Sequence, residues 1–187
     1  MQLLLASKSP RRRELLGRLG FPLSFVESEA EEKVSPQLPA HEVAESLARI
    51  KADGYRGRLS GDQVLVTADT VVVLGNLVLG KPHSREEAIG MLSRLSGNAH
   101  QVYTGVNLRN VSRSLSFTER TDVHFRTLSE QEIVYYVDTY SPYDKAGAYG
   151  IQEWIGMVGI ERIEGCFYNV MGLPVARLYR ELIQLMA

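Results

Sequence analysis

The chain has 187 residues, of which 44% are hydrophobic and 23% are charged, and its formal net charge is -1. This length and composition suit a globular protein of one domain or two closely joined lobes, and we expect a single domain over residues 1–187. The near-neutral charge argues against a protein whose whole face is basic, as nucleic-acid and membrane-surface proteins have. Any anion site must therefore be local.

The cysteine content and the hydropathy pattern indicate where the protein works. The one cysteine, Cys166, excludes an internal disulfide, and we interpret it as a buried thiol in a reducing compartment. The apolar start Leu3–Ala6 is too short for a signal-peptide core, and no stretch approaches the roughly 18 apolar residues of a membrane span. We therefore expect a cytoplasmic protein that binds no membrane.

The first predicted elements are a strand at Leu3–Ala6 and a helix directly after it. Ser9 serves as the N-cap of this helix, Pro10 takes its first position, and Gly20 ends it. Residues 11–13 are all arginine, although a basic side chain at the positive pole of the helix dipole costs about 0.3–1 kcal/mol. This placement indicates an anionic partner near the start of the helix.

The elements that follow are predicted from periodicity and turn residues. They are a strand at Phe21–Val26, a loop at Glu27–Pro39, a helix at about His41–Arg56, a strand at Val64–Leu74, a two-residue turn at Gly75-Asn76 and a returning strand at Leu77–Leu79. The valine-rich strand and the short strand after it therefore form a predicted hairpin.

Two capping boxes mark helices in the second half of the chain: Ser84 with Glu87, and Ser129 with Glu132. The other predicted elements are a strand from Val102 to Leu108 with one buried face, a strand at about Leu115–Phe125, one more strand at Ile155–Ile163 and a last helix from about Pro174. Strand and helix alternate at first and long antiparallel strands follow. This order predicts an α/β or α+β fold with a mixed sheet.

The start of the first helix is a candidate phosphate site. Unpaired backbone N–H groups and the dipole attract anions there, and the turn follows a strand, at the edge of the sheet where α/β proteins bind ligands. Because successive helical residues point about 100° apart, we expect Ser9, Arg11 and Arg12 to face the anion and Arg13 to face solvent. An ordinary capped helix with solvated arginines is the alternative.

The pair Asp69-Thr70 interrupts the valine-rich strand. A carboxylate within an apolar run must be paired, protonated or used in chemistry. If Gly75-Asn76 forms a two-residue turn, Thr70 falls opposite Lys81, which brings Asp69, Thr70 and Lys81 close together. The alternative is a structural Asp–Lys pair at the end of a strand.

Three further features suit a nucleotide or a metal ion. The amide of Gln152, in a glycine-rich stretch, is complementary to the donor and acceptor that uracil and thymine present, with a plain surface loop as the alternative. Glu29, Glu31 and Glu32 either hold a hard metal ion together with phosphate oxygens or form a solvated loop. Lys51 borders the buried face of its helix and either snorkels to solvent or points at a phosphate.

Four stretches together resemble the Maf family of nucleoside triphosphate pyrophosphatases. They are ASKSPRRRELL, ADTVVVLGNLVLGKP, DKAGAYGIQ and YNVMGLPVARL, in this order across nearly the whole chain. The resemblance implies an α/β fold with a mixed twisted sheet in two lobes and a central cleft, as in inosine triphosphate pyrophosphatases. It also implies hydrolysis of a nucleoside triphosphate to the monophosphate and pyrophosphate with a divalent cation, in a cytoplasmic protein that is often a homodimer.

Within the family, the sequence is similar to the branch that acts on dTTP and UTP. Arg11, Thr70 and Gln152 stand at the three points where the branch acting on 7-methyl-GTP has other residues. One departure is that Glu153 and Trp154 follow Gln152, where the family often continues with glycine.

The resemblance gives the candidate residues their roles. The residues that would bind the triphosphate are Ser9, Arg11, Arg12, Lys51 and Lys81. Asp69 would be the general base for the attacking water, and Asp69 with Glu32 would hold a magnesium or manganese ion. Thr70 and Gln152, with Arg11, would select a pyrimidine.

Two alternatives stand beside this interpretation. One is a nucleotide-binding regulator of septum formation without catalysis, and the other is an enzyme of the same class that selects purines. The carboxylate of Asp69 near Lys81 favours the enzyme, because a pure binder needs no base there. The expected partner is a nucleoside triphosphate substrate, with no nucleic acid.

Overall fold

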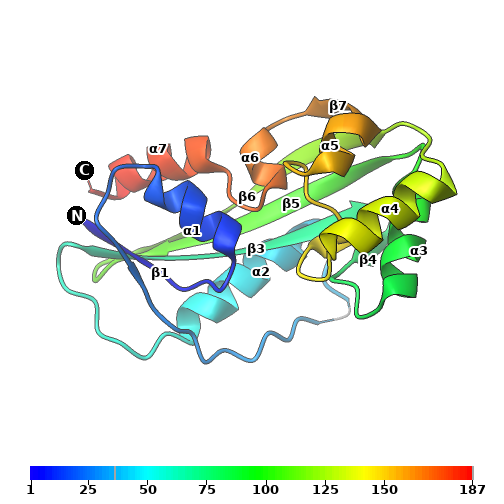
Figure 1. Ribbon diagram of the computed structural model, residues 1–187. Helices are drawn as coiled ribbons and strands as arrows, with labels where there is room; N and C mark the ends of the chain where they lie inside the picture. Colours follow the sequence, from blue (N-terminus) through cyan, green and yellow to red (C-terminus); the bar gives the residue numbers. More distant parts are fainter. Residues whose placement is uncertain (36, 187) are drawn as a thin grey trace. The chain divides into compact units, whose positions relative to one another are not determined.

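The computed structural model of the protein describes residues 1–35 and 37–186 (Figure 1). Its strands are β1 (Gln2–Leu5), β2 (Leu23–Phe25), β3 (Gln63–Leu74), β4 (Leu77–Leu79), β5 (Ala99–Arg109), β6 (Ser114–Phe125) and β7 (Ile160–Glu164). Its helices are α1 (Pro10–Gly17), α2 (Ala40–Asp53), α3 (Arg85–Leu95), α4 (Glu130–Tyr140), α5 (Trp154–Gly159), α6 (Phe167–Val170) and α7 (Val175–Met186), with a 3-10 turn at Ala146–Ala148. Among the described residues, no helix is both long enough and apolar enough to cross a membrane.

The strands form one mixed sheet in the order β2-β1-β3-β5-β6-β7, with β4 paired to β3. β1 runs parallel to both of its neighbours, whereas β4 is antiparallel to β3 and β7 is antiparallel to β6. The predicted mixed sheet and hairpin are therefore confirmed. Leu74 pairs with Leu77 across the turn, where Gly75 adopts a φ of 60° that glycine tolerates without steric cost.

The chain divides into two compact units. The first unit contains residues 1–69, 104–119 and the described chain from residue 172 onward, and the second contains residues 70–103 and 120–171. The strands β3, β5 and β6 each contribute residues to both units.

In the first unit, helices cover both faces of the strands: α1 and α7 lie on one side of β1 and β3, and α2 lies on the other (Figure 1). The predicted cap of α1 is confirmed, although the helix ends at Gly17 instead of near Gly20. On the α2 side, the hydroxyl of Thr67 donates a hydrogen bond to the carbonyl of Ala48 at 2.6 Å. Burial on both faces explains why β3 is nearly continuous in apolar residues.

The second unit has its own apolar core, to which β3, β5, β6 and the helices α3, α4 and α5 contribute. The capping box of Ser129 and Glu132 is confirmed at the start of α4. The box at α3 is formed only in part. The Ser84 side chain accepts from the backbone N–H of Glu87, but the Glu87 carboxylate accepts from the backbone of His83.

The predicted strand at Ile155–Ile163 is wrong for most of its length, because residues 154–159 form α5 and only residues from Ile160 onward join β7. The backbone N–H of Gly156 donates to the carbonyl of Glu153 at 3.0 Å, which begins a helical turn. Ile155 and Gly159, four residues apart, are the buried positions of this helix. A short apolar run fits the periodicity of a helix as well as that of a strand, so periodicity does not distinguish a helix from a strand here.

Two smaller predictions also need correction. β5 does not keep a single buried face, since every residue from Thr104 to Leu108 is buried. Cys166 is half-buried instead of buried.

Candidate active site

The start of α1 has the predicted cap geometry. The Oγ atom of Ser9 accepts the backbone N–H of Arg12 at 3.5 Å, and Pro10 occupies the first helical turn. The Ser9 backbone N–H donates in turn to Oγ of Ser7 at 3.2 Å. The loop between β1 and α1 is therefore ordered by side-chain hydrogen bonds at the positive pole of the helix.

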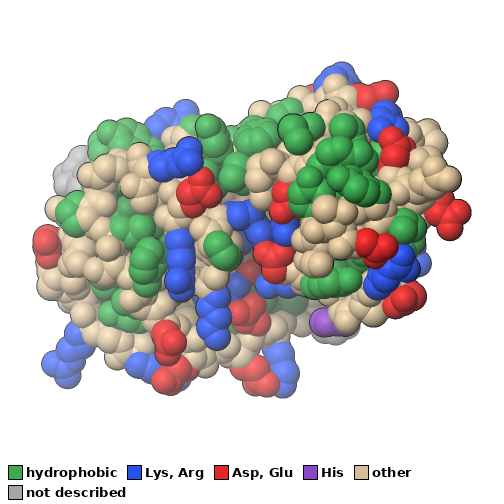
Figure 2. Space-filling view, viewed as in Figure 1, with side chains coloured by type: hydrophobic (Ala, Val, Ile, Leu, Met, Phe, Trp, Pro, Cys, Tyr) green, Lys and Arg blue, Asp and Glu red, His purple; other side chains and the backbone are tan. Residues whose placement is uncertain are grey.

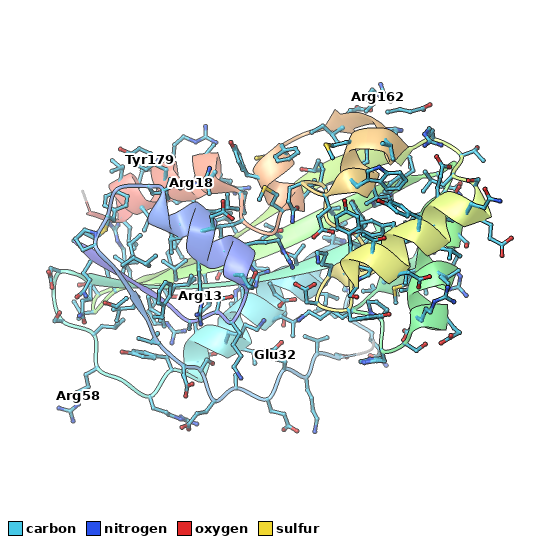
Figure 3. All side chains as sticks on the ribbon, viewed as in Figure 1. Arg13, Arg18, Glu32, Arg58, Arg162 and Tyr179 are labelled. Carbon is cyan, nitrogen blue, oxygen red and sulfur yellow. The ribbon has the colours of Figure 1, made fainter. Side chains whose placement is uncertain are left out.

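The three arginines of α1 have different surroundings. Arg12 is buried, and its guanidinium donates from Nε to the carbonyl of Gly172 at 2.8 Å and from Nη1 to the carbonyl of Ala68 at 2.9 Å. Arg13 is exposed, as predicted, and its guanidinium lies 4.6 Å from the centre of the Phe25 ring (Figure 3). Arg11 is half-buried.

Arg12 is both buried and close to other charged side chains. Burial lowers the pKa of Arg12, and the nearby positive charge of Arg11 lowers it further, whereas the negative charges of Asp69 and Glu32 act in the opposite direction. An arginine keeps its proton even when its pKa falls, so Arg12 brings a fixed positive charge into the interior beside these carboxylates.

Asp69 forms an ion pair within the first unit. The Nζ atom of Lys51, on α2, lies 2.5 Å from Oδ1 of Asp69 and 3.2 Å from Oε2 of Glu32. The side chains of Lys51 and Asp69 are 14% and 17% exposed, whereas that of Glu32 is 51% exposed. The Lys51 side chain thus does not extend into solvent. Its ammonium group pairs with two carboxylates.

Glu29, Glu31 and Glu32, in the loop before α2, have different partners. Oε2 of Glu29 lies 3.6 Å from Nε of Arg56, and Oε1 of Glu31 lies 2.5 Å from Nζ of Lys33. Of these three glutamates, Glu32 is the one that pairs with Lys51. Glu32 extends from this loop beside α2 (Figure 3).

Asp69 and Glu32 offer carboxylate oxygens, the donor type that a hard divalent cation prefers. Within the part of the chain that the structure describes, no three His, Cys, Asp or Glu side chains converge on one point. Asp69 and Glu32 supply two carboxylates around a position that a cationic Lys51 group already occupies. Magnesium is commonly held by one or two carboxylates together with substrate phosphates and water, which agrees with this pair.

The remaining predicted site residues, Thr70, Lys81 and Gln152, belong to the second unit. The antiparallel register pairs Val72 with Leu79, and Lys81 follows β4 by two residues as an exposed side chain. The ammonium group that pairs with Asp69 comes from Lys51, which the hairpin pattern did not indicate. The only sequence signal for Lys51 was its position beside the buried face of α2.

Gln152 is exposed on the second unit and lines an open groove of about 510 Å³ with Ile151, Met157, Ile160 and Phe167 among its neighbours. The surface over α4 and α5 is rich in hydrophobic side chains (Figure 2). The turn that carries Gln152 is held by Tyr136, which no sequence motif marked.

This architecture defines a mixed α/β protein in which a lysine pairs with two carboxylates near a buried arginine. The chain belongs to the Maf family, since the family model described as Maf-like protein matches residues 2–185. The resemblance found in the four sequence stretches is thereby confirmed.

Similar proteins match along almost the whole chain. A dTTP/UTP pyrophosphatase of Bacteroides thetaiotaomicron is 50% identical over 187 residues, covering 98% of this chain and 96% of that protein. A protein of the same name from Porphyromonas gingivalis is 49% identical over 187 residues, covering 97% and 92%. The solved structure of the Staphylococcus aureus Ham1 protein has a TM-score of 0.49 at 13% identity, covering 67% of this chain and 72% of that chain.

Proposed function

We propose that this protein is a nucleoside triphosphate pyrophosphatase that hydrolyses dTTP and UTP to the nucleoside monophosphate and pyrophosphate. The observation that carries the proposal is the cluster of Asp69, Lys51 and Glu32, beside the buried charge of Arg12. Asp69 supplies a carboxylate that can act as a base, and Lys51 and Arg12 supply positive charges that can bind phosphates. The relatives named dTTP/UTP pyrophosphatase, at about half identity over nearly the full length, support the same activity.

The chemistry assigned to Asp69 is that of a general base. Its carboxylate takes a proton from a water molecule, the water oxygen forms a bond to the α-phosphorus, and the bond from that phosphorus to the bridging α–β oxygen breaks. Pyrophosphate leaves with the electron pair. The residues proposed to bind the triphosphate are Ser9, Arg11, Arg12, Lys51 and Lys81.

Asp69 and Glu32 are proposed to hold a magnesium or manganese ion. When bound, such an ion neutralises charge that develops on the phosphate oxygens. Lys51 bonds to both carboxylates and so holds them near one another before substrate arrives.

Selection of the base is assigned to Gln152, with Thr70 and Arg11. A side-chain amide offers one donor and one acceptor, which match the edge of uracil and thymine. Cytosine reverses the hydrogen-bond sense at two positions of that edge. An unpaired polar group costs about 1–3 kcal/mol, which corresponds to roughly tenfold to a hundredfold discrimination.

The proposal also covers the organisation of the protein. We propose that residues 1–187 act as a single Maf-like domain, which is supported by a family match over residues 2–185 and by three strands that run through both units. The family resemblance and the single cysteine support a cytoplasmic enzyme. The resemblance also supports a homodimer.

One experiment tests the activity. Purified protein is given dTTP, UTP, CTP, GTP or 7-methyl-GTP with magnesium or manganese, and pyrophosphate and orthophosphate are measured separately. We expect pyrophosphate from dTTP and UTP. Orthophosphate as the first product, or equal kcat/KM for UTP and GTP, would contradict the proposal. Binding of dTTP without turnover would favour the regulator instead.

A further inference from the structure

Gln152 is carried by a tight turn of the second unit. The backbone N–H of Glu153 donates to the carbonyl of Gly150 at 3.0 Å, which closes a four-residue turn with Gln152 at its third position. A turn of this kind fixes where the backbone of Gln152 lies. The direction of its side chain depends in addition on the groups that surround it.

One buried hydroxyl group bonds to both ends of this turn. The Tyr136 hydroxyl, on α4, accepts the backbone N–H of Gly150 at 3.0 Å and donates to Oε2 of Glu153. Tyr136 is fully buried, and both burial and the carboxylate of Glu153 raise the pKa of its hydroxyl. The hydroxyl therefore stays protonated and can donate to Glu153 and accept from Gly150 at the same time.

A lysine holds the second oxygen of the same carboxylate. Nζ of Lys145 lies 3.1 Å from Oε1 of Glu153 and 2.8 Å from Oδ1 of Asp144. Lys145 is only 7% exposed, and a buried ammonium group is tolerated when it is paired. Both carboxylate oxygens of Glu153 are thus engaged, one by Tyr136 and one by Lys145.

The amide of Gln152 and this carboxylate lie on the same side of Gly150. A Cβ atom placed on Gly150 would be 3.1 Å from Nε2 of Gln152 and 3.1 Å from Oε2 of Glu153. The amide and the carboxylate are therefore neighbours above Gly150, where the absence of a side chain leaves them room. Any movement of the Glu153 carboxylate would change the space and the charge that the Gln152 amide meets.

The rest of the loop is fixed to the hairpin of the same unit. The backbone N–H of Gly147 donates to the carbonyl of Gly80, next to Lys81, at 3.0 Å. Gly147 and Ala148 have φ angles of 69° and 59°. A left-handed alanine is a strained conformation that persists only where the surrounding contacts determine it.

We propose that Tyr136 is a positioning residue, whose hydroxyl holds Gly150 and Glu153 together and so orients the Gln152 amide that distinguishes uracil and thymine from cytosine. Lys145 completes this arrangement by fixing the other oxygen of Glu153. The inference rests on the proposed pyrimidine nucleotide activity, because Gln152 has a base to select only in that case.

The first test compares Tyr136→Phe with Tyr140→Phe. The control removes the same group from the same helix, in a ring stacked 5.0 Å from Tyr136. The readout is the ratio of kcat/KM for UTP to kcat/KM for CTP, which does not depend on the fraction of folded enzyme. We expect the ratio to fall roughly threefold to tenfold in Tyr136→Phe, as for the loss of one or two hydrogen bonds, and to stay at the wild-type value in Tyr140→Phe.

A second pair of variants separates positioning from general stability. Glu153→Gln keeps an oxygen that can accept from the Tyr136 hydroxyl, whereas Glu153→Ala keeps none. We expect Glu153→Gln to retain more of the UTP preference than Glu153→Ala. A merely structural role would lower the melting temperature of these variants and leave the nucleotide ratio unchanged, and that result would overturn the inference.

A third measurement does not depend on activity. Hydrogen exchange of the Gly150 amide should be faster in Tyr136→Phe than in Tyr140→Phe, because its acceptor is lost. Equal exchange in the two variants would by itself overturn the inference that Tyr136 holds Gly150. A wild-type protein that releases no pyrophosphate from UTP would instead contradict the proposed function, whatever the exchange shows.

Discussion

The two units of this protein use the same ion-pair chemistry in different ways. Each contains a lysine that bonds to two carboxylates: Lys51 in the first unit and Lys145 in the second. In the first unit, one of the two carboxylates is that of Glu32 on an exposed loop. In the second, the carboxylate of Glu153 is also bonded by the fully buried Tyr136.

The surroundings of one carboxylate in each unit, Glu32 or Glu153, decide what each ion pair can do. Glu32, at 51% exposure, can leave Lys51 at little cost, since exposed ion pairs contribute about 0–1 kcal/mol. The carboxylate of Glu153 cannot move without depriving a buried hydroxyl of its hydrogen-bond acceptor. The first arrangement suits exchange with a substrate or a metal ion, and the second suits the fixed orientation of a neighbouring amide.

The largest expected effect is that of Asp69→Asn in the first unit. Asparagine keeps the shape but cannot take a proton from water, so turnover of dTTP should fall roughly 10²–10⁴-fold. Binding of dTTP should change much less, because the cations remain. Turnover, calorimetric binding and melting temperature measured on one preparation test this. A folded variant with near wild-type turnover would remove Asp69 from the mechanism, and an early-melting variant with normal activity would make Asp69 structural.

Acid should affect the second unit through His100. Burial lowers the pKa of this histidine to about 4. Because its pKa in the unfolded chain is near 6.5, the unfolded state binds more protons between these values, and stability falls as the pH drops through this window by about 3 kcal/mol in all. Urea unfolding at pH 7.5 and pH 4.5 measures the loss. It should be smaller in His100→Gln, and an identical loss in both proteins would contradict the assignment.

The two lysines should separate phosphate binding from base selection. Lys51→Met removes a charge that is proposed to bind phosphate, so kcat/KM should fall roughly tenfold to a hundredfold for UTP and for CTP alike. Lys145→Met frees one oxygen of Glu153 and should lower the ratio of UTP to CTP. Steady-state kinetics of both variants with both nucleotides provide the measurement. The comparison between the units fails if Lys51→Met changes the ratio or if Lys145→Met does not.

The smallest effects concern the two serine caps. Ser9→Ala and Ser129→Ala each remove a side-chain acceptor at a helix start, at a cost of about 1 kcal/mol in unfolding free energy. Only Ser9 is also proposed to bind phosphate, so only its variant should raise KM for dTTP. Chemical denaturation and kinetics on both variants test the pair. An equal rise in KM would show that Ser9 has no role beyond the cap.

Local signals in the sequence determined several elements of this protein. Ser9-Pro10 predicts the start of α1, Gly75-Asn76 predicts the turn between β3 and β4, and Ser129 with Glu132 predicts the start of α4. These signals succeed because the interactions involved lie within a few residues along the chain. The stretch at residues 154–159 failed for the opposite reason, since its short apolar run fits a strand or a helix until its packing against Phe125 and Leu128 is known.

For the candidate site, the sequence by itself determined which residues carry charge. It also determined that Asp69 interrupts a valine-rich strand and that Gln152 lies in a glycine-rich stretch. Only the tertiary structure decided their partners. Lys51 reaches Asp69 from 18 residues away, and the Tyr136 hydroxyl reaches Glu153 from 17 residues away. Arg12 donates to the carbonyl of Gly172, 160 residues further along the chain. Such contacts leave no periodic pattern in a sequence, because burial and the requirement to pair each buried polar group act only after the chain has folded.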